Sequence, residues 1–237
     1  MARLSVQDVT KTFALNGARL HAVEGVSFEV EAGEFVSIIG HSGSGKTTLL
    51  SIVGGLTRPT SGRVFFDGVD VNALGGDALS EYRSGSIGFV FQFASLLPAL
   101  TVMENLLLPG SFLPARPRAD EARAKALELL GLMGLEEKTD AFPAQLSGGQ
   151  QRRAAIARAF MNDPALILAD EPTGDLDEET EADVMRVFRM LNERSGATFM
   201  MVTHNTELAR QAPRRMRMHR GRMVEEAPAP RGRMRQG

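Results

Sequence analysis

The sequence predicts an α/β fold with a largely parallel central sheet, an antiparallel β subdomain and an inserted α-helical subdomain. Continuous apolar runs at 35–40 (FVSIIG), 165–169 (ALILA) and 197–203 (ATFMMVT) have the composition of strands that are buried on both faces. Helical patterns separate these runs, which favours parallel strands joined by helices. The first 35 residues instead alternate between apolar and polar residues, as half-buried antiparallel strands do.

The composition is consistent with a fold of this size. The chain has 237 residues, of which 43% are hydrophobic, enough for one large domain with or without an inserted subdomain. It has no cysteine, which excludes disulfides, thiol nucleophiles and cysteine-ligated metal sites. The N-terminus lacks an apolar signal segment, and no apolar run approaches the ~20 residues of a membrane-spanning helix. We therefore expect a soluble or peripheral protein.

Charge is distributed unevenly along the chain. The net charge is −2, but eight arginines and two glutamates give residues 213–237 a charge of +6 and leave −8 for the rest. A basic end can attract anionic lipid or nucleic acid. Arginine also makes up 23 of the 27 basic residues in the whole chain, so a frayed terminus with the same bias explains the pattern more simply. We predict a basic, disordered tail at 225–237.

The N-terminal third is predicted to contain two antiparallel strands, near 3–10 and 22–30, with a turn (ALNGA) between them. The apolar run FVSIIG then forms the first buried strand, and a helix should follow from Gly45 to about Val53. A strand pair is expected near 63–71 (RVFFDGVDV).

A strand at 87–91 (IGFVF) precedes the predicted helical subdomain, which covers about 93–160. Thr101 and Glu104 have the spacing of a capping box, and 119–133 has apolar residues at helical intervals after an acidic first turn. Five prolines mark turns or loops between the helices of this stretch: Pro98, Pro109, Pro114, Pro117 and Pro143. A polar amphipathic helix is expected at about 178–194, between the last two buried strands.

The segment GHSGSGKT at 40–47 matches a phosphate-binding loop, and it lies between a predicted strand and a predicted helix, as that motif requires. Its glycines allow backbone amides to surround phosphate oxygens at a helix N-terminus. Lys46 can then bridge the β- and γ-phosphates, and the Thr47 hydroxyl can ligate Mg²⁺. The alternative is a glycine-rich turn with a chance lysine. The expected nucleotide contacts here are Gly40, His41, Ser42, Gly43, Ser44, Gly45, Lys46, Thr47 and Thr48, with His41 at a variable, solvent-facing position.

A second candidate lies where the strand of ALILADEP (165–172) ends in two carboxylates. Ligands bind at the carboxyl ends of strands in open parallel sheets. Asp170 is therefore expected to hold Mg²⁺ through water, and Glu171 to act as the general base that polarises the attacking water. An Asp-Glu pair at a strand end is also a common charge pair at a helix start, but the phosphate loop upstream favours the catalytic interpretation.

Gln92 and His204 each follow a strand of the same predicted sheet, after IGFVF and FMMVT. A single Gln or His at a strand end is most often a hydrogen-bonded loop residue. The assignment of both residues to the site is strengthened because their strands end on the predicted phosphate side of the sheet.

The stretch LSGGQQRR at 146–153 combines a helix-start signal with residues that weaken a helix. Ser147 and Gln150 have capping-box spacing, yet Gly148 and Gly149 lie between them. Glycine in a first turn suggests that another group must approach that backbone closely.

In order and spacing, these motifs together with TGDLD at 173–177 resemble the nucleotide-binding subunit of ABC transporters, from about residue 3 to 224. The resemblance implies a P-loop NTPase (RecA-like) core, an ATP-binding domain over 1–224, and ATP and Mg²⁺ as ligands. Phe13 lies where an aromatic side chain stacks on adenine, although a strand-packing Phe is the simpler alternative. Gln92 matches the Q-loop that contacts Mg²⁺ and the reacting water, and His204 matches the switch histidine.

The resemblance also implies a homodimer in which two ATP molecules are shared between subunits. The signature helix of one subunit presents its amides to the γ-phosphate held by the other, which explains the glycines of LSGGQQRR. The residues implied to act across the dimer are Ser147, Gly148, Gly149, Gln150 and Asp177. The implied catalytic residues are Glu171, His204, Lys46 and Gln92, and those implied to hold the metal are Thr47, Gln92 and Asp170.

Within the family, GGLTRPTSG at 54–62, IGFVFQFASLLPALTVMEN at 87–105 and ILADEPTGDLD at 167–177 resemble the branch of LolD, MacB and FtsE. The FQF…LLP segment and the ending GATFMMVTHNTELA…MRMHRGRM resemble the lipoprotein-release ATPase LolD most. This branch implies a translocase subunit on the inner face of the inner membrane that powers a permease. The permease is expected to dock near Gln92, Leu96, Leu97 and Pro98, and no nucleic acid is expected as a partner.

The chain departs from the usual family pattern at four positions: Arg152, Ala154, Asp175 and Asn205. None removes a catalytic group. Two alternatives stay open: an FtsE-like regulatory ATPase of cell division, and a non-transport ABC ATPase that acts on DNA or the ribosome. Proteins of the second kind usually carry a long coiled coil or two such domains in one chain, and this sequence has neither. The cargo is expected to be recognised by the membrane and periplasmic parts of the transporter, so this sequence does not identify it.

Overall fold

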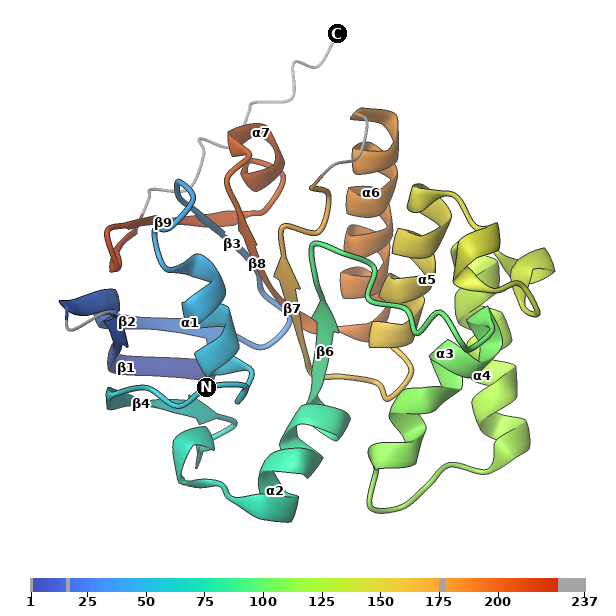
Figure 1. Cartoon of the computed structure of the whole chain (residues 1–237), viewed down its shortest axis with the longest axis horizontal. Coiled ribbons are helices and arrows are strands. Elements are labelled where there is room, and N and C mark those ends of the chain that lie inside the picture. Colours follow the sequence, from blue (N-terminus) through green and yellow to red (C-terminus); the bar gives the residue numbers. More distant parts are fainter. Residues whose placement is uncertain (1, 16–17, 175–177, 226–237) are drawn as a thin grey trace, which may run out of the picture.

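Two β-sheets with helices between and beside them form the fold (Figure 1). The computed structural model describes residues 2–15, 18–174 and 178–225. The predicted tail, apart from Glu225, and residues 175–177, which include the expected dimer residue Asp177, lie outside the described residues. The α/β architecture expected from the sequence is confirmed.

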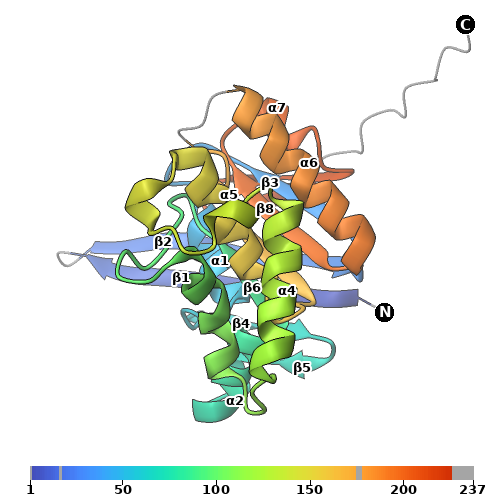
Figure 2. The same ribbon diagram turned by 90° about the vertical axis from the view of Figure 1, so that its right-hand side faces the viewer.

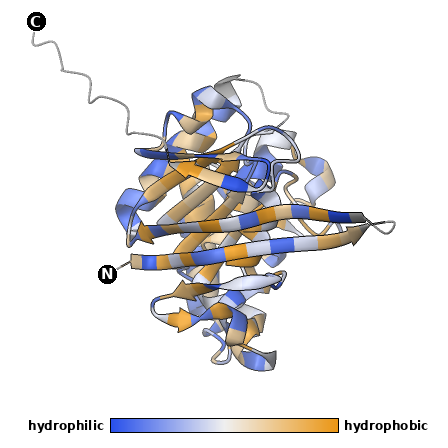
Figure 3. Ribbon diagram, turned by 90° about the vertical axis from the view of Figure 1, so that its left-hand side faces the viewer, coloured by the Kyte–Doolittle hydropathy of each residue, from blue (hydrophilic) through white to orange (hydrophobic). Residues whose placement is uncertain are grey.

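The first sheet is antiparallel, with the strand order β2-β1-β4-β5. Its strands are β1 (Ala2–Leu15), β2 (Ala18–Glu31), β4 (Ser61–Phe66) and β5 (Val69–Asp70). Hydrophobic and hydrophilic residues alternate along β1 and β2 (Figure 3), so one face of the sheet is apolar and packs inward. The antiparallel pairs predicted at the N-terminus and near 63–71 are therefore present, with the first two strands longer than expected.

The second sheet has the order β10-β9-β3-β8-β7-β6, and all its neighbours are parallel except the β9–β10 pair. Its strands are β3 (Phe35–Ile39), β6 (Ile87–Val90), β7 (Leu166–Asp170), β8 (Thr198–Thr203), β9 (Arg214–His219) and β10 (Arg222–Glu225). The carboxyl ends of β3, β6, β7 and β8 meet at one edge, which is where the sequence predicted its site residues.

Alternate residues of the parallel strands enter two different hydrophobic clusters. In β7, Leu166 and Leu168 pack with α1 (Lys46–Val53) and the antiparallel sheet, whereas Ile167 and Ala169 face the opposite side. Helix α1 is therefore enclosed by both sheets. Because every residue of β7 is buried, the sequence of this strand shows a continuous apolar run instead of alternation.

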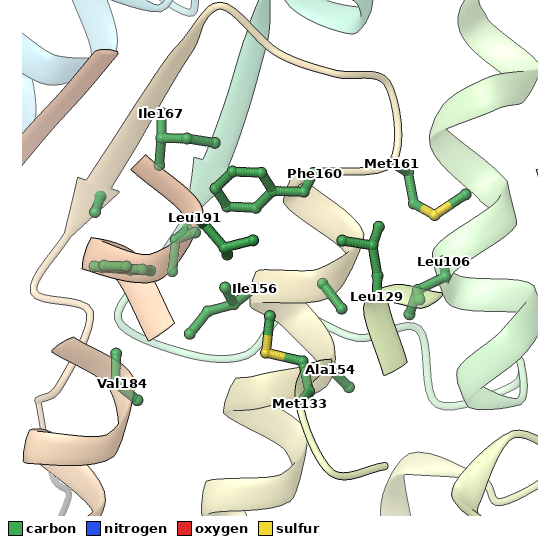
Figure 4. Packing of buried hydrophobic residues seen from close by; sticks show 14 of the residues in the cluster. Leu106, Leu129, Met133, Ala154, Ile156, Phe160, Met161, Ile167, Val184 and Leu191 are labelled. Carbon is green, nitrogen blue, oxygen red and sulfur yellow. The ribbon is translucent and has the colours of Figure 1, made fainter. Parts of the chain in front are cut away.

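Helices cover the other face of the parallel sheet and extend into the predicted helical subdomain (Figures 1 and 2). They are α3 (Val102–Leu107), α4 (Ala119–Leu132), α5 (Gly148–Ala159) and α6 (Glu178–Ser195), with 3₁₀ turns at Leu108–Phe112, Glu136–Lys138 and Pro143–Gln145. Figure 4 shows side chains of all four helices and of β7 meeting in one cluster around α5. Helix α5 therefore joins the helical subdomain to the core.

Three features of the fold differ from the sequence-based expectation. The helical stretch begins at Val102, because residues 93–101 form an irregular segment. Helix α2 (Gly76–Glu81) and the helical turn Tyr82–Ser86 were not predicted. The hairpin β9–β10 was also missed: its strands lie within the arginine-rich end, where charge hides the alternation of buried Met216 and Met218 with exposed residues. A short helix, α7 (Thr206–Ala209), and a 3₁₀ turn at Val71–Ala73 complete the fold.

Candidate functional site

A cavity of about 610 Å³ lies at the carboxyl edge of the parallel sheet, beside the N-terminus of α1. Most of the residues that the sequence predicted to bind nucleotide or catalyse hydrolysis within one chain line this cavity. The lining residues are Phe13, Leu20, His21, Ala22, His41, Ser42, Gly43, Ser44, Gly45, Lys46, Thr47, Thr48, Gln92, Asp170, Glu171 and His204. Segments from both sheets therefore converge on one polar cavity.

The phosphate-binding loop has a backbone that only glycine can adopt at Gly45. The φ of Gly45 is +101°, and a Cβ atom there would lie 2.0 Å from the carbonyl oxygen of Ala22. Behind the loop, the tip of the β9–β10 hairpin supports it, because the Gly221 amide donates a hydrogen bond of 3.1 Å to the Ser44 carbonyl. His41 is exposed at the mouth of the cavity, as expected.

Lys46 is only 6% exposed, and its ammonium group folds back over the loop. Its Nζ donates to the carbonyl oxygens of Gly40 at 2.7 Å and His41 at 3.2 Å, and it lies 3.7 Å from Oε1 of Glu171. The two carbonyls carry no net charge, so the positive charge of Lys46 remains inside the cavity, where a phosphate can displace them.

Thr47 and Asp170 form a pair of oxygen ligands at the start of α1. The Thr47 hydroxyl donates to Oδ1 of Asp170 at 3.2 Å. Burial raises the pKa of Asp170; the nearby Glu171 charge raises it further, whereas the Thr47 hydrogen bond and the Lys46 charge lower it. Hydroxyl and carboxylate oxygens are hard ligands of the kind Mg²⁺ prefers.

Within the described residues, no three His, Asp or Glu side chains form a ready metal cluster. A divalent ion at this pair would therefore need further oxygen ligands from phosphate or water, which is the usual way Mg²⁺ is bound beside nucleotides.

Glu171 is held by two hydrogen-bond donors at the end of β8 and lies beside the His204 ring. One carboxylate oxygen, Oε2, accepts from the Thr203 hydroxyl at 3.0 Å and from the His204 amide at 3.2 Å, and it lies 3.0 Å from Nδ1 of His204. The other, Oε1, faces Lys46. The structure thus brings Glu171, His204, Lys46 and Asp170 together, which the sequence expected.

Gln92 lines the cavity, and its backbone is held by a residue that sequence reasoning did not assign to the site. The Arg152 guanidinium donates to the carbonyl oxygens of Phe91 and Gln92, and to that of Gly174 at 3.4 Å. In the sequence, Arg152 was noted only as a departure from the family pattern after the signature. Its role could not be predicted there, because its partners lie far away in the chain.

Phe13 projects from β1 into the cavity and is 40% exposed, which excludes the strand-packing alternative. Its ring centroid lies 5.1 Å from Nζ of Lys11. His21 on β2 lines the same wall, and its Nδ1 lies 3.0 Å from the Thr12 hydroxyl. Sequence reasoning missed His21, because a lone His in an alternating strand carries no signal.

The signature residues do not reach this cavity within one chain. Ser147 caps α5: its hydroxyl accepts from the Gln150 amide at 3.2 Å, and Oε1 of Gln150 accepts from the Ser147 amide at 2.9 Å. The predicted capping box is therefore present. A Cβ atom on Gly148 would meet nothing within 4 Å, whereas one on Gly149 would lie 3.1 Å from Cγ2 of Thr180. The contact with Thr180 thus explains why position 149 is a glycine, whereas no contact among the described residues explains the glycine at position 148.

Asn205, one of the four departures noted in the sequence, fits its surroundings as an amide. Its side-chain nitrogen donates to Oε2 of Glu181 at 3.2 Å, and the Thr173 hydroxyl donates to the same oxygen at 3.1 Å. An Asp at position 205 would repel Glu181.

Of the predicted docking residues, Gln92 lines the polar cavity, whereas Leu96, Leu97 and Pro98 do not. Leu97 is 45% exposed and Pro98 is exposed, while Leu96 packs partly against the core. Beside this segment, a second, more apolar cavity of about 550 Å³ lies between β6, the turn after α2, and the helical subdomain, with Phe89, Phe91 and Phe112 in its wall. No helix among the described residues is long and apolar enough to cross a membrane.

The chain is similar to known proteins over nearly its whole length. A family model described as ABC transporter matches residues 23–174. The lipoprotein-releasing system ATP-binding protein LolD of Geobacter metallireducens is 45% identical over 223 residues, 94% of this chain and 98% of that protein. The macrolide export ATP-binding/permease protein MacB of Syntrophobacter fumaroxidans is 45% identical over 97% of this chain, which spans 32% of that longer protein.

The fold is also similar to a solved one. An ATP-binding cassette of Methanocaldococcus jannaschii, solved as a dimer in a post-hydrolysis state bound to ADP and Pi, has a TM-score of 0.88 and 42% identity, with 95% of this chain and 98% of that chain covered.

Proposed function

Because the chain belongs to the ABC transporter family and is an ATP-binding, ATP-hydrolysing protein, we propose that it is the ATPase subunit of a transporter of the LolD/MacB type. In this role it powers a membrane permease in lipoprotein release or efflux. The LolD and MacB names of its relatives favour this branch over an FtsE-like regulator or a non-transport ATPase. The observation that carries the proposed hydrolysis is the arrangement of Glu171 among His204, Thr203 and Lys46.

In the proposed reaction, Glu171 is the general base for the water that attacks the γ-phosphate. Its Oε2 is held by Thr203 and His204, so the carboxylate is oriented before substrate arrives. Lys46 neutralises charge on the phosphates, and it lies 3.7 Å from Oε1 of Glu171. Phe13 stacks on the adenine, Gln92 orients the water, and His204 contacts the γ-phosphate.

Thr47, Asp170 and Gln92 are proposed to hold Mg²⁺. The oxygen pair of Thr47 and Asp170 suits a hard cation. When bound, this ion neutralises phosphate charge and orients the transferring group. Asp170 contributes its carboxylate at the end of β7, which fixes its position relative to Glu171.

Two copies of the chain are proposed to join head to tail, so that the start of α5 in one copy closes the ATP cavity of the other. The exposed Ser147 and the open space around Gly148 support this arrangement, because a phosphate can approach the start of α5 there without meeting another described residue. Gln150 and Asp177 complete the contribution of the second copy.

The decisive experiment is Glu171→Gln in the full chain. Loss of a general base should lower ATP turnover about 10²- to 10⁴-fold, while the intact cavity still binds ATP and the dimer accumulates. Nucleotide-dependent dimerisation is measured by sedimentation. Adding Ser147→Arg to this variant should return it to a monomer with ATP still bound. Parental turnover by Glu171→Gln would refute the base assignment, and loss of ATP binding on adding Ser147→Arg would refute the shared site.

The permease is proposed to dock beside the Gln92 segment, at the inner face of the inner membrane. Leu97 and Phe93 are exposed there, and the apolar cavity around Phe91 and Phe112 lies next to them. An exposed apolar surface beside a hollow favours insertion of an apolar helix of the permease.

A further inference from the structure

Helix α5 holds the segment that follows β6 through two arginines. Arg152 donates to the carbonyl oxygens of Phe91 and Gln92. Arg158 donates to those of Ser95 at 2.8 Å and Ala94 at 3.4 Å. Four backbone carbonyls between residues 91 and 95 are therefore bound by side chains of the helix that begins with the signature.

Arg152 also reaches a third segment of the site. Its Nη2 donates to the carbonyl oxygen of Gly174 at 3.4 Å, three residues after Glu171. The side chain is only 5% exposed, so these carbonyls replace water around a buried charge. A planar guanidinium can serve acceptors on two segments at once, whereas a lysine ammonium cannot match that geometry.

The two segments that Arg152 joins touch each other at Gln92. A Cβ atom on Gly174 would lie 3.3 Å from Cγ and 3.4 Å from Nε2 of Gln92, so the Gln92 side chain passes directly over the glycine. Gln92, Glu171 and Lys46 line the same cavity. The backbone that Arg152 fixes on both sides therefore determines where the Gln92 amide lies relative to Glu171.

Helix α5 itself is firmly packed. Ala154, Ile156 and Ala157 are completely buried in the cluster that joins the helical subdomain to the parallel sheet (Figure 4). A movement of the helical subdomain that carries α5 would therefore also carry the carbonyls bound by Arg152.

We propose that Arg152 is a positioning residue for ATP hydrolysis: it sets the Gln92 side chain against Glu171 and makes the Gln92 segment move with the signature helix. This inference rests on the role proposed above for Gln92. Arg152 does not touch the substrate in this scheme and acts only through Gln92.

A double-mutant cycle in the full chain tests the inference. We expect Arg152→Gln and Gln92→Ala each to lower kcat about 10- to 100-fold, as misplacement of an orienting group does, with the Kd for ATP unchanged. The double variant should be no slower than Gln92→Ala alone, because both changes remove the same interaction. The matched control is Arg153→Gln, which removes a neighbouring arginine of α5 that donates to the Met133 carbonyl at 2.8 Å, away from Gln92. It should keep the parental kcat.

The outcomes separate the two hypotheses. If Gln92→Ala hydrolyses ATP at the parental rate, the proposed role of Gln92 is wrong and the inference falls with it. Arg152 has no positioning role if Gln92→Ala is slow but the losses of kcat from Arg152→Gln and Gln92→Ala multiply in the double variant. The same conclusion follows if Arg152→Gln lowers kcat no more than Arg153→Gln. In both cases the proposed function of Gln92 stands. Should Arg152→Gln fail to fold, Arg152→Lys retains the charge and is expected to give the same loss of kcat, with parental kcat in that variant overturning the inference.

Discussion

Glu171 shows how a single residue of this site is constrained. Its φ is +44°, in the left-handed region that costs a non-glycine residue roughly 1–2 kcal/mol. Backbone hydrogen bonds hold it there: its amide donates to the Val202 carbonyl at 2.9 Å, and its own carbonyl accepts from the Gly174 amide at 3.0 Å. One strained backbone position of this fold is therefore the proposed base, and the surrounding hydrogen bonds fix its orientation.

At the same scale, Gly45 should tolerate no side chain. Gly45→Ala places a Cβ 2.0 Å from the Ala22 carbonyl oxygen at a φ of +101°, so we expect a loss of more than about 2 kcal/mol of unfolding free energy together with loss of ATP binding. Urea unfolding and a nucleotide-binding titration measure both.

The control for that change is Gly43→Ala. Gly43 also has a positive φ, +74°, but a Cβ atom there would meet nothing within 4 Å. Only the backbone strain of roughly 1–2 kcal/mol should remain. Equal losses of stability in the two variants would mean that the contact with Ala22 is unimportant.

Helix α5 shows how one element serves several parts of the site. Its N-terminus carries the signature and its capping box, its interior joins the helical subdomain to the core, and Arg152 and Arg158 hold the Gln92 segment. The sequence identified the first of these roles, because a capping box is a local pattern. The packing of its interior depends on residues from several other elements, and the contacts of Arg152 and Arg158 depend on residues 60 and 63 positions away along the chain.

The first turn of α5 allows stability and function to be separated. A Cβ atom on Gly148 meets nothing in this chain, so Gly148→Ala should leave the unfolding free energy unchanged or raise it by up to about 1 kcal/mol through helix propensity. It should nevertheless lower ATPase activity, because the methyl group occupies the space proposed for the phosphate of the partner. Urea unfolding without nucleotide and steady-state ATPase assays give the two readouts.

Gly149→Ala serves as the comparison within the same turn. Its Cβ would lie 3.1 Å from Thr180, so crowding against α6 should cancel the gain in propensity. Full ATPase activity in Gly148→Ala would argue against a partner phosphate at this position.

For the whole molecule, the packing of two sheets and the helical subdomain leaves two cavities at different edges of the fold. The polar cavity lies where four parallel strands end, and the apolar cavity lies where the core meets the helical subdomain. The Gln92 segment runs between them, with Phe91 in one wall and Gln92 in the other. A permease docked on the apolar side would therefore contact the same segment that lines the ATP cavity.

The docking proposal predicts that Leu97→Asp weakens association with the permease. An Asp there would place a charge in a surface meant for apolar contact, and we expect about a tenfold or greater rise in Kd. Leu127→Asp is the matched control, since Leu127 is similarly exposed, 41% against 45%, but lies on α4. Co-purification with a candidate permease produced together with the chain gives the measurement, and equal retention of both variants would contradict the docking surface.

The sequence by itself determined the parts of this protein that depend on short stretches of chain. The phosphate-binding loop, the Asp170–Glu171 pair and the capping box at Ser147 each follow from local backbone chemistry and could be identified from spacing alone. The parallel sheet followed from the continuous apolar runs, and the convergence of Lys46 with Glu171 followed from the shared strand edge.

Only the tertiary structure decided the rest. Arg152 holds Gln92 and Gly174, Gly149 makes room for Thr180, and the β9–β10 hairpin supports the phosphate-binding loop through Gly221. These contacts join residues far apart in the chain, and their side chains have no distinctive local pattern. Their roles arise when folding brings them together, so a single sequence shows the chemical groups but not their partners.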